Sequence, residues 1–511
     1  MIPAPHASAV ETLGLSYSRR IFVNRTIELD DVDAIGFDMD YTLCRYRPEL
    51  EGLATELAIQ HLVKRGYPDA LLQIRFDPAW GIRGLVIDTA KGNVVKMDAH
   101  RHVTRAWHGL TPIGDGERRA MYASDPPRLS AGRWAMMDTL FSTPESFLYC
   151  HIVDLIEGHA GHPMEAAETR RLYADIRYCI DMVHRDDSLK SAVRNDLAKY
   201  IDVDPHLAQA LHRLRSAGKK LFVLTNSDMS YTEHVMTYLL DGALSGYRTW
   251  QDYFDAIWVT ACKPRFFEVA QEPFRLGEKS FDQGSREYLE RDLGVSGDKI
   301  LYVGDHIYGD VLKSRSTTGW RTALIMPEVE GELAALESEA EAMSLRSALE
   351  EERFDLEGAL ASAELSLRAA RRAERKSLVD DDEGLLDPGY ADDGLLAAEV
   401  ADPSLADASS AELLSERETL RAWVLELRER LKHNTAESVR FTKQIDRHFN
   451  PRWGQLLNER HKHSLFGNQM KSYACLYTSR VSNLAAYSPR HKFEPPRDLL
   501  PHERMLRFVG Q

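Results

Sequence analysis

The stretch Ala34-Ile-Gly-Phe-Asp38-Met-Asp40-Tyr-Thr-Leu43 joins a short apolar run to two carboxylates one residue apart. Val32 to Phe37 predicts a buried β-strand, because the run is too short and too rich in β-branched residues for an ordinary helix. Asp38 and Asp40 then lie at its carboxyl end, where open α/β sheets place their ligands. Different environments there can give the two carboxylates different pKa values, which suits a nucleophile beside a general acid. Taken alone, the pattern fits a structural Asp-rich turn at least as well.

Length and composition are those of a globular chain with room for about three domains. The 511 residues are 43% hydrophobic, and no run approaches the ~20 apolar residues of a membrane-spanning helix. The amino terminus lacks a charged region followed by an apolar one, so secretion is not expected. Five scattered cysteines suit a reducing compartment and form no zinc-binding pair. We therefore expect a cytoplasmic protein with no membrane association.

The net charge of −15 is concentrated in one segment. Residues 379–410 carry ten acidic side chains and no Lys or Arg, which leaves about −5 for the rest of the chain. Because no basic stripe is present, nucleic-acid binding is disfavoured as the main role. An acidic protein that binds phosphates needs local cations or a metal ion to do so.

Strand and helix patterns alternate along the first two thirds of the chain. Residues 18–48 contain the first core strand, and the same design of apolar strand and polar end recurs three times within 201–328. This alternation predicts a parallel sheet with a site along one edge. Between these blocks, residues 49–200 predict a cap domain that begins with a helix at 50–66 and continues with a hairpin over 73–98. The cap is expected to be mostly helical from Trp134 to Tyr200.

The carboxyl-terminal third changes to long helices. Heptad-like apolar spacing predicts helices over 329–378 and 411–450, on either side of the acidic segment 379–410. An antiparallel hairpin with a disordered acidic tip is one arrangement, and a helical face packed on the core is the alternative. Residues 451–511 are rich in aromatic and amide side chains and are expected to pack on the core.

Four strand ends carry the groups that phosphoryl transfer requires. In chain order these residues are Asp38, Asp40 and Thr42, then Thr225 and Asn226, then Lys263, and finally Gly304, Asp305 and Asp310. They supply a nucleophile, an acid/base, hydroxyl and amide donors, a cation and carboxylates for Mg²⁺. Enzymes accelerate phosphate monoester hydrolysis by up to ~10²¹-fold over the uncatalysed rate. Positioning of the reacting groups can lower the barrier by only ~7–11 kcal/mol, so the metal ion and the cation must also contribute.

The order and identity of these residues resemble the haloacid dehalogenase-like (HAD) superfamily of aspartate-dependent phosphotransferases. More narrowly, four segments are similar to the cytosolic purine (IMP/GMP-preferring) 5′-nucleotidase family. They are Gly36-Phe-Asp-Met-Asp-Tyr-Thr-Leu43, Arg20-Ile-Phe-Val-Asn-Arg25, Tyr302-Val-Gly-Asp-His-Ile-Tyr-Gly-Asp310 and Cys475-Leu-Tyr-Thr-Ser479. Tyr41 and the His306 to Asp310 segment carry the narrower resemblance, which covers nearly the whole chain except the acidic insert. It implies an α/β fold: a HAD-like Rossmannoid parallel sheet with helices on both faces, a large α+β cap insert after the first motif, and a carboxyl-terminal helical extension.

The resemblance also implies roles for the matching residues. Asp38 attacks phosphorus and becomes an aspartyl-phosphate, and Asp40 protonates the leaving 5′-oxygen and then activates water. Thr225 and Asn226 bind the phosphoryl group, and Lys263 neutralises it and holds Asp38.

The metal and the rest of the substrate are assigned in the same way. Mg²⁺ is expected on Asp38, the Asp40 backbone carbonyl and Asp305, with Asp310 either completing or orienting that set of ligands. The candidates for contacts to the base and sugar are Arg83, Asp88 and Lys96. A solvated hairpin face is the alternative for Arg83 and Lys96.

We therefore expect a Mg²⁺-dependent 5′-nucleotidase that hydrolyses purine ribonucleoside 5′-monophosphates, with phosphotransfer to nucleosides as a branch of the same reaction. The expected partners are a purine nucleoside monophosphate and further copies of the chain in a homo-oligomer. Two alternatives stay open: a phosphatase of another small phosphate ester, and a catalytically silent interaction protein that uses the helical arm. The cap is expected to close over the substrate and exclude water.

Overall fold

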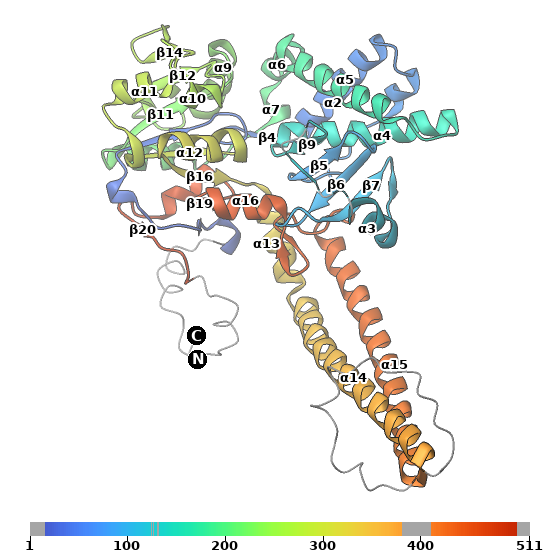
Figure 1. Ribbon diagram of the computed structural model, residues 1–511. Helices are drawn as coiled ribbons and strands as arrows, with labels where there is room; N and C mark the ends of the chain where they lie inside the picture. The colour runs from blue at the N-terminus through green and yellow to red at the C-terminus, as the bar shows by residue number, and fades with distance from the viewer. Residues whose placement is uncertain (1–15, 124, 126, 130–131, 381–409, 498–511) are drawn as a thin grey trace. The chain divides into compact units, whose positions relative to one another are not determined.

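The computed structural model describes residues 16–123, 125, 127–129, 132–380 and 410–497 (Figure 1). The chain forms two compact units. One unit runs to Ala335 and resumes at Phe449, and the other extends from Leu336 to His448. The residues expected as core and cap therefore share one unit, and the long helices belong to the other.

The main sheet has nine strands in the order β1-β19-β16-β15-β3-β11-β12-β14-β13. Their bounds are β1 Phe22–Val23, β3 Ala34–Phe37, β11 Lys220–Leu224, β12 Ala256–Val259, β13 Phe274–Arg275, β14 Ser280–Asp282, β15 Ile300–Gly304, β16 Arg321–Ile325 and β19 Leu476–Thr478. Neighbours from β19 to β14 pair in parallel, and the edge strands β1 and β13 pair antiparallel. The parallel sheet expected from the sequence is confirmed. The strand expected from Val32 begins two residues later, at Ala34.

The central strands are buried on both faces because helices cover the two sides. Ile35 and Phe37 of β3 share a cluster with residues of α8 (Leu207–Ser216) and α9 (Met229–Leu240). Alternate residues of the strands belong to a second cluster with α10 (Arg265–Glu268) and α11 (Arg286–Leu293). The Phe222 ring of β11 packs directly over Gly36, where a Cβ atom would collide with it. Gly36 therefore permits close packing beside the strand that carries Asp38.

Residues 49–200 form a second sheet with helices packed on it. Five antiparallel strands have the order β8-β7-β6-β5-β9. The strands are β5 Leu85–Asp88, β6 Asn93–Met97, β7 Val103–His108, β8 Thr111–Pro112 and β9 Trp134–Met137, and the helices are α2 Glu49–Lys64, α3 Asp115–Ala123, α4 Thr143–Ala160, α5 Ala166–Arg185, α6 Ser188–Asn195 and α7 Leu197–Tyr200. The hairpin expected over 73–98 is the β5–β6 pair. The start of the block expected to be mostly helical is instead β9, which pairs with β5.

A narrow two-stranded ribbon connects this block to the main sheet. β4 (Arg45–Tyr46) leads the chain out of the main sheet, and β10 (Ile201–Asp202) brings it back. The two strands pair antiparallel, with Tyr46 opposite Ile201. The ribbon begins only a few residues after Asp40, so the insertion starts directly beside the expected site.

Between β16 and β17 the described residues form three helices, where the sequence predicted two. They are α13 (Glu328–Ser338), α14 (Ala340–Asp380) and α15 (Ser410–His448). The single helix expected over 329–378 is therefore divided near Glu339. α14 and α15 form an antiparallel hairpin, with Arg428 donating to Glu364 and Asn434 donating to the carbonyl of Leu349. Most of the acidic segment expected to be disordered, residues 381–409, lies outside the described residues.

The carboxyl-terminal segment belongs to the unit that contains the main sheet. Its strand β19 pairs with β16 and β1. Its other elements are β17 Asn458–Glu459, β18 Lys462–His463, α16 Leu465–Tyr473 and β20 Lys492–Phe493, which pairs with β2 Ile27–Glu28. Residues 498–511 of the segment expected to pack on the core lie outside the described residues. Among the described helices, none combines the length and apolar composition that crossing a membrane requires.

Candidate active site

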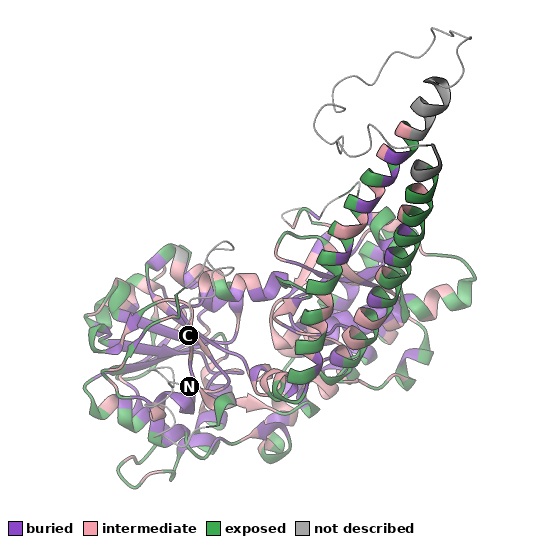
Figure 2. Ribbon diagram, turned by 90° about the horizontal axis from the view of Figure 1, so that it is seen from below, coloured by how far each residue is buried: buried purple, intermediate pink, exposed green. Residues whose placement is uncertain are grey.

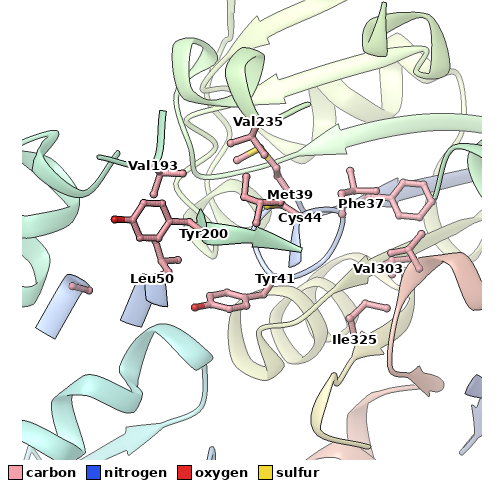
Figure 3. Packing of buried hydrophobic residues seen from close by; sticks show 14 of the residues in the cluster. Phe37, Met39, Tyr41, Cys44, Leu50, Val193, Tyr200, Val235, Val303 and Ile325 are labelled. Atoms are coloured by element: carbon pink, nitrogen blue, oxygen red, sulfur yellow. The ribbon is translucent and has the colours of Figure 1, made fainter. Parts of the chain in front are cut away.

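Asp38 and Asp40 directly follow β3, at the carboxyl end of the strand. Met39, between them, points into the core. Met39 is fully buried, and its carbonyl accepts hydrogen bonds from the amides of Thr42 and Cys44 at 3.3 and 2.9 Å. Figure 3 shows Met39 and Cys44 together among the apolar side chains. Tyr41 takes a left-handed backbone conformation with φ of 54°. This tight turn anchors the two carboxylates on the body of the sheet.

Lys263 holds the centre of the site. Its Nζ lies 2.9 Å from Asp38 Oδ1, 2.8 Å from Asp310 Oδ1 and 2.8 Å from the hydroxyl of Tyr302. The Tyr302 hydroxyl in turn donates to the carbonyl of Leu224 at 2.9 Å. Burial alone would lower the pKa of Lys263, but the charges of Asp310 and Asp38 outweigh it and raise the pKa. Lys263 is therefore a permanent cation between two carboxylates.

Three buried carboxylates gather beside this cation. Oxygens of Asp38, Asp305 and Asp310 lie within 4.8 Å of one another. Burial, together with the charges of Asp310 and Asp40, raises the pKa of Asp38 to about 8 against the opposing charge of Lys263. Burial also raises the pKa of Asp305 well above its ordinary value, with Asp310 and Asp38 adding to the effect. Such mutual repulsion in a small space is relieved when a cation binds.

These residues fit a divalent metal ion. Asp305 Oδ2 is buried and has no hydrogen-bond partner among the described residues. A cluster of carboxylate oxygens with an uncommitted oxygen suits a hard cation such as Mg²⁺. When bound, Mg²⁺ would supply the positive charge that keeps these carboxylates ionised and that attracts phosphoryl oxygens.

A π-helical turn, η7 (Ile307–Lys313), places Asp310. Such turns are rare and occur often at functional sites. Asp310 Oδ2 accepts the backbone N–H of His306 at 3.1 Å, so the carboxylate folds back over the end of β15. A Cβ atom at Gly304 would lie 2.5 to 2.6 Å from Asp310, which leaves room for glycine alone. His306 caps this turn by accepting the backbone N–H groups of Tyr308 and Gly309.

The carboxylate of Asp40 is separate from the three-carboxylate cluster. Its Oδ1 accepts the Tyr46 hydroxyl at 2.6 Å, and its Oδ2 accepts the Ser227 hydroxyl at 2.8 Å. The Tyr46 hydroxyl also lies 2.9 Å from the hydroxyl of Tyr231. Two hydroxyl groups therefore fix the direction of this carboxylate, as a group that transfers a proton requires.

Thr225 and Asn226 make different contacts near the site. Thr225 is fully buried, and its hydroxyl oxygen accepts the backbone N–H of Ser227 at 3.1 Å. Asn226 clamps the backbone of Lys263, because its Oδ1 accepts the Lys263 N–H at 2.7 Å and its amide donates to the Lys263 carbonyl at 3.3 Å. Asn226 therefore positions the loop that carries the cation. The role of both residues at the phosphoryl group stays a prediction.

Arg83 is buried behind the carboxylate cluster. Its guanidinium makes two 2.7 Å hydrogen bonds to the carboxylate of Glu328 and one of 2.8 Å to the carbonyl of Asp305. Arg83 therefore joins residues 49–200 to the backbone of a predicted metal ligand. These contacts are all to the protein, and the expected contact to the base or sugar stays a prediction.

Asp88 and Lys96 are also engaged by protein partners. Asp88 is fully buried and accepts two hydrogen bonds from Arg133 at 2.6 and 2.7 Å. Lys96 is 2% exposed, lies 2.8 Å from Glu459, and donates to three backbone carbonyls. The alternative of a solvated hairpin face is wrong for Lys96 and Arg83, because both are buried. Their predicted contact to substrate is untested, and the structure gives each a structural partner.

Other residues at the site were not predicted from the sequence. Tyr302 and Ser227 reach Lys263 and Asp40, and the aromatic residues Tyr41, Phe141 and His184 form a chain with ring centroids 4.7 and 5.3 Å apart. The Tyr41 hydroxyl donates to Glu51 of α2 at 2.5 Å. One signal was available for Tyr302, since a tyrosine in an otherwise apolar buried strand needs a partner for its hydroxyl. Phe141 and His184 carried no local signal.

Comparison with known families agrees with this geometry. A model of the 5′ nucleotidase family matches residues 21–505, which is nearly the whole chain. This protein belongs to the 5′ nucleotidase family. The resemblance drawn from the four motif segments is thereby confirmed, and family membership makes the protein a phosphoric monoester hydrolase.

Relatives of this 5′ nucleotidase family member are found in different organisms. A 5′-nucleotidase domain-containing protein of Dictyostelium discoideum is 28% identical over 510 residues, covering 95% of this chain and 75% of the relative. The 5′-nucleotidase domain-containing protein 2 of Rattus norvegicus is 32% identical over 361 residues, covering 64% of this chain and 63% of the rat protein. Among solved structures, a predicted phosphoglycolate phosphatase from Haemophilus somnus covers 58% of this chain and 86% of its own, with 15% identity and a TM-score of 0.26.

Proposed function

We propose that this protein is a Mg²⁺-dependent 5′-nucleotidase that hydrolyses purine ribonucleoside 5′-monophosphates through an aspartyl-phosphate on Asp38. The placement of Lys263 carries the proposal, because its Nζ contacts both Asp38 Oδ1 and Asp310 Oδ1. A buried cation shared between a nucleophile and a predicted metal ligand gives the charge pattern that phosphoryl transfer requires.

The free oxygen of Asp38 is the proposed nucleophile. Oδ1 already accepts hydrogen bonds from Lys263 Nζ and, at 2.8 Å, from the backbone N–H of Met39. We therefore assign the attack on phosphorus to Oδ2. As the new O–P bond forms, the bond from phosphorus to the ribose 5′-oxygen breaks, and Asp40 gives its proton to that oxygen. Asp40 then takes a proton from water, whose oxygen bonds to phosphorus as the bond to Asp38 breaks. Inorganic phosphate and the free carboxylate of Asp38 are the products.

The aromatic chain beside Asp40 supports a substrate with a planar base. Tyr41, Phe141 and His184 adjoin one another, and Phe141 and His184 are half-buried rather than enclosed. Burial lowers the pKa of His184 against the opposing charge of Asp40, so its imidazole is neutral at pH 7. Neutral rings of this kind stack on purines without adding charge to the site.

The test is phosphate release from a panel of substrates with purified full-length protein and Mg²⁺. We expect IMP and GMP to be hydrolysed faster than AMP, pyrimidine nucleotides and non-nucleotide phosphate esters. Asp38→Asn serves as the control, with its fold checked by circular dichroism. Faster turnover of another phosphate ester would favour the phosphatase alternative, and no turnover of any ester would favour the silent interaction protein. Activity in the Asp38→Asn protein would contradict the covalent mechanism.

Phosphotransfer is a second outcome of the same intermediate. A nucleoside 5′-hydroxyl in place of water would regenerate a nucleotide from the aspartyl-phosphate. Incubation of IMP with labelled inosine separates the two, because labelled IMP forms only by transfer. Absence of labelled IMP at saturating inosine would limit the enzyme to hydrolysis.

A further inference from the structure

The helix α14 carries exposed apolar residues on the side opposite its buried seam. Leu356, Ala363 and Leu367 pack on α15 and define that seam. Phe354 and Leu365 are 78% and 55% exposed. They lie eleven residues apart, about three helical turns, so both project roughly opposite Leu356. Figure 2 shows the two long helices mostly green, with buried residues in a narrow purple row.

Two small residues separate Phe354 from Leu365 on this outer face. Gly358 and Ala361 are both exposed, and a Cβ atom added at Gly358 would meet no atom within 4 Å. A glycine inside a helix costs about 1 kcal/mol relative to alanine, and the hairpin itself does not need this one. Small residues between two large ones allow another helix to approach closely.

Charge along α14 changes sign at the middle of the helix. From Ala340 to Glu364 it has seven acidic and two basic side chains, and from Leu365 to Ala373, the last position whose side chain is described, it has three basic and no acidic ones. Two such helices repel when parallel and in register. They attract when antiparallel, because each acidic half then faces a basic half.

We propose that α14 pairs antiparallel with α14 of a second copy of this chain about a two-fold axis between Ala359 and Leu360. Residues that lie equally far from the axis in opposite directions along the helix face each other across the interface. Phe354 therefore contacts the partner's Leu365, and Gly358 contacts the partner's Ala361. Glu351 meets the partner's Arg368 on the same stripe. Each contact occurs twice, as a two-fold interface requires. A second copy is favoured over an unrelated partner because the apolar, small and charged positions complement one another within a single sequence.

The first test measures the mass of the full-length protein in solution by light scattering and sedimentation. Wild type is expected to self-associate, and Phe354→Glu/Leu365→Glu is expected to halve the assembly because four charges enter the apolar stripe. Leu425→Glu is the matched control, since Leu425 is 55% exposed on α15 and lies away from the α14 stripe. Circular dichroism checks that the helices persist. A monomeric wild type, or a double variant of unchanged mass, would overturn the proposal.

The second test decides the direction of pairing. Glu351→Arg and Arg368→Glu should each weaken self-association at least tenfold, because like charges then face each other twice. An equimolar mixture of the two variants should restore the dimer, since every facing pair becomes opposite in sign. Both effects should shrink at high salt. Variants that stay dissociated on mixing would overturn the antiparallel arrangement.

Discussion

Lys263 and Asp38 form a buried ion pair, with Nζ 2.9 Å from Oδ1 and side chains only 4% and 12% exposed. Removal of the cation leaves Asp38 and Asp310 without their shared counter-charge. Lys263→Met should therefore lower kcat about 10²- to 10³-fold, the usual effect of losing one charge-stabilising donor. Without Mg²⁺ it should also lower the free energy of unfolding by about 3 kcal/mol, measured in urea.

Lys313→Met is the matched control for that change. Lys313 pairs with Glu268 near the surface, where solvent screens an ion pair and its loss has little effect on stability. Its kcat should stay at the wild-type level. Equal losses in the two variants would mean that Lys263 acts through general stability alone.

Gly304 should tolerate no side chain, because a Cβ atom would lie 2.5 Å from Asp310 Oδ2. Gly304→Ala should displace Asp310 and weaken Mg²⁺ binding at least tenfold. The readout is the rise in melting temperature on adding Mg²⁺, which does not depend on activity. Gly52→Ala in α2 meets no neighbouring atom and should keep the full Mg²⁺ response. An undiminished response in Gly304→Ala would place the metal away from Asp310.

Arg83 is expected to position the backbone of Asp305, a predicted metal ligand, rather than to bind the nucleotide base. Its bonds to Glu328 and to the Asp305 carbonyl need the fork of a guanidinium, so Arg83→Lys should lose most of them. We expect a fall of a few kcal/mol in the free energy of unfolding together with lower kcat. A raised KM for nucleotide at unchanged stability would instead support the contact predicted from the sequence.

Glu332 of α13 should make stability depend on pH. Burial raises its pKa to about 7, with Leu457 N–H and Lys96 only partly opposing. The folded protein therefore holds a proton that the unfolded chain releases near pH 4.5, so the free energy of unfolding falls as pH rises from about 4.5 to 7. The loss should reach about 3 kcal/mol.

Glu332→Gln should remove this slope, measured by urea unfolding between pH 5 and 8. The matched control is Glu337→Gln, at an exposed position of the same helix. A slope that persists in Glu332→Gln would assign the titration to another group.

The sequence by itself determined the order of the strand ends and the residues they carry. Asp38, Lys263 and Asp305 each come after a short apolar run. Helices between such runs favour parallel strands, and parallel strands have their carboxyl ends at one edge of the sheet. That local logic needs no knowledge of distant contacts. Heptad spacing, a property of neighbouring residues, also predicted the two long helices, and the hairpin that α14 and α15 form was one of two arrangements it allowed.

Only the tertiary structure decided the partners of buried charges. Arg83, Asp88 and Lys96 were predicted to contact substrate, which stays a prediction, and the structure adds that they pair with Glu328, Arg133 and Glu459. Arg83 and Glu328 are 245 positions apart, and no local pattern encodes such a pairing. Burial makes these pairs obligatory, since an unpaired charge inside a protein is far too costly. The same holds for Asp40, whose direction depends on hydroxyl groups brought by Tyr46 of β4 and by Ser227 of the loop between β11 and α9.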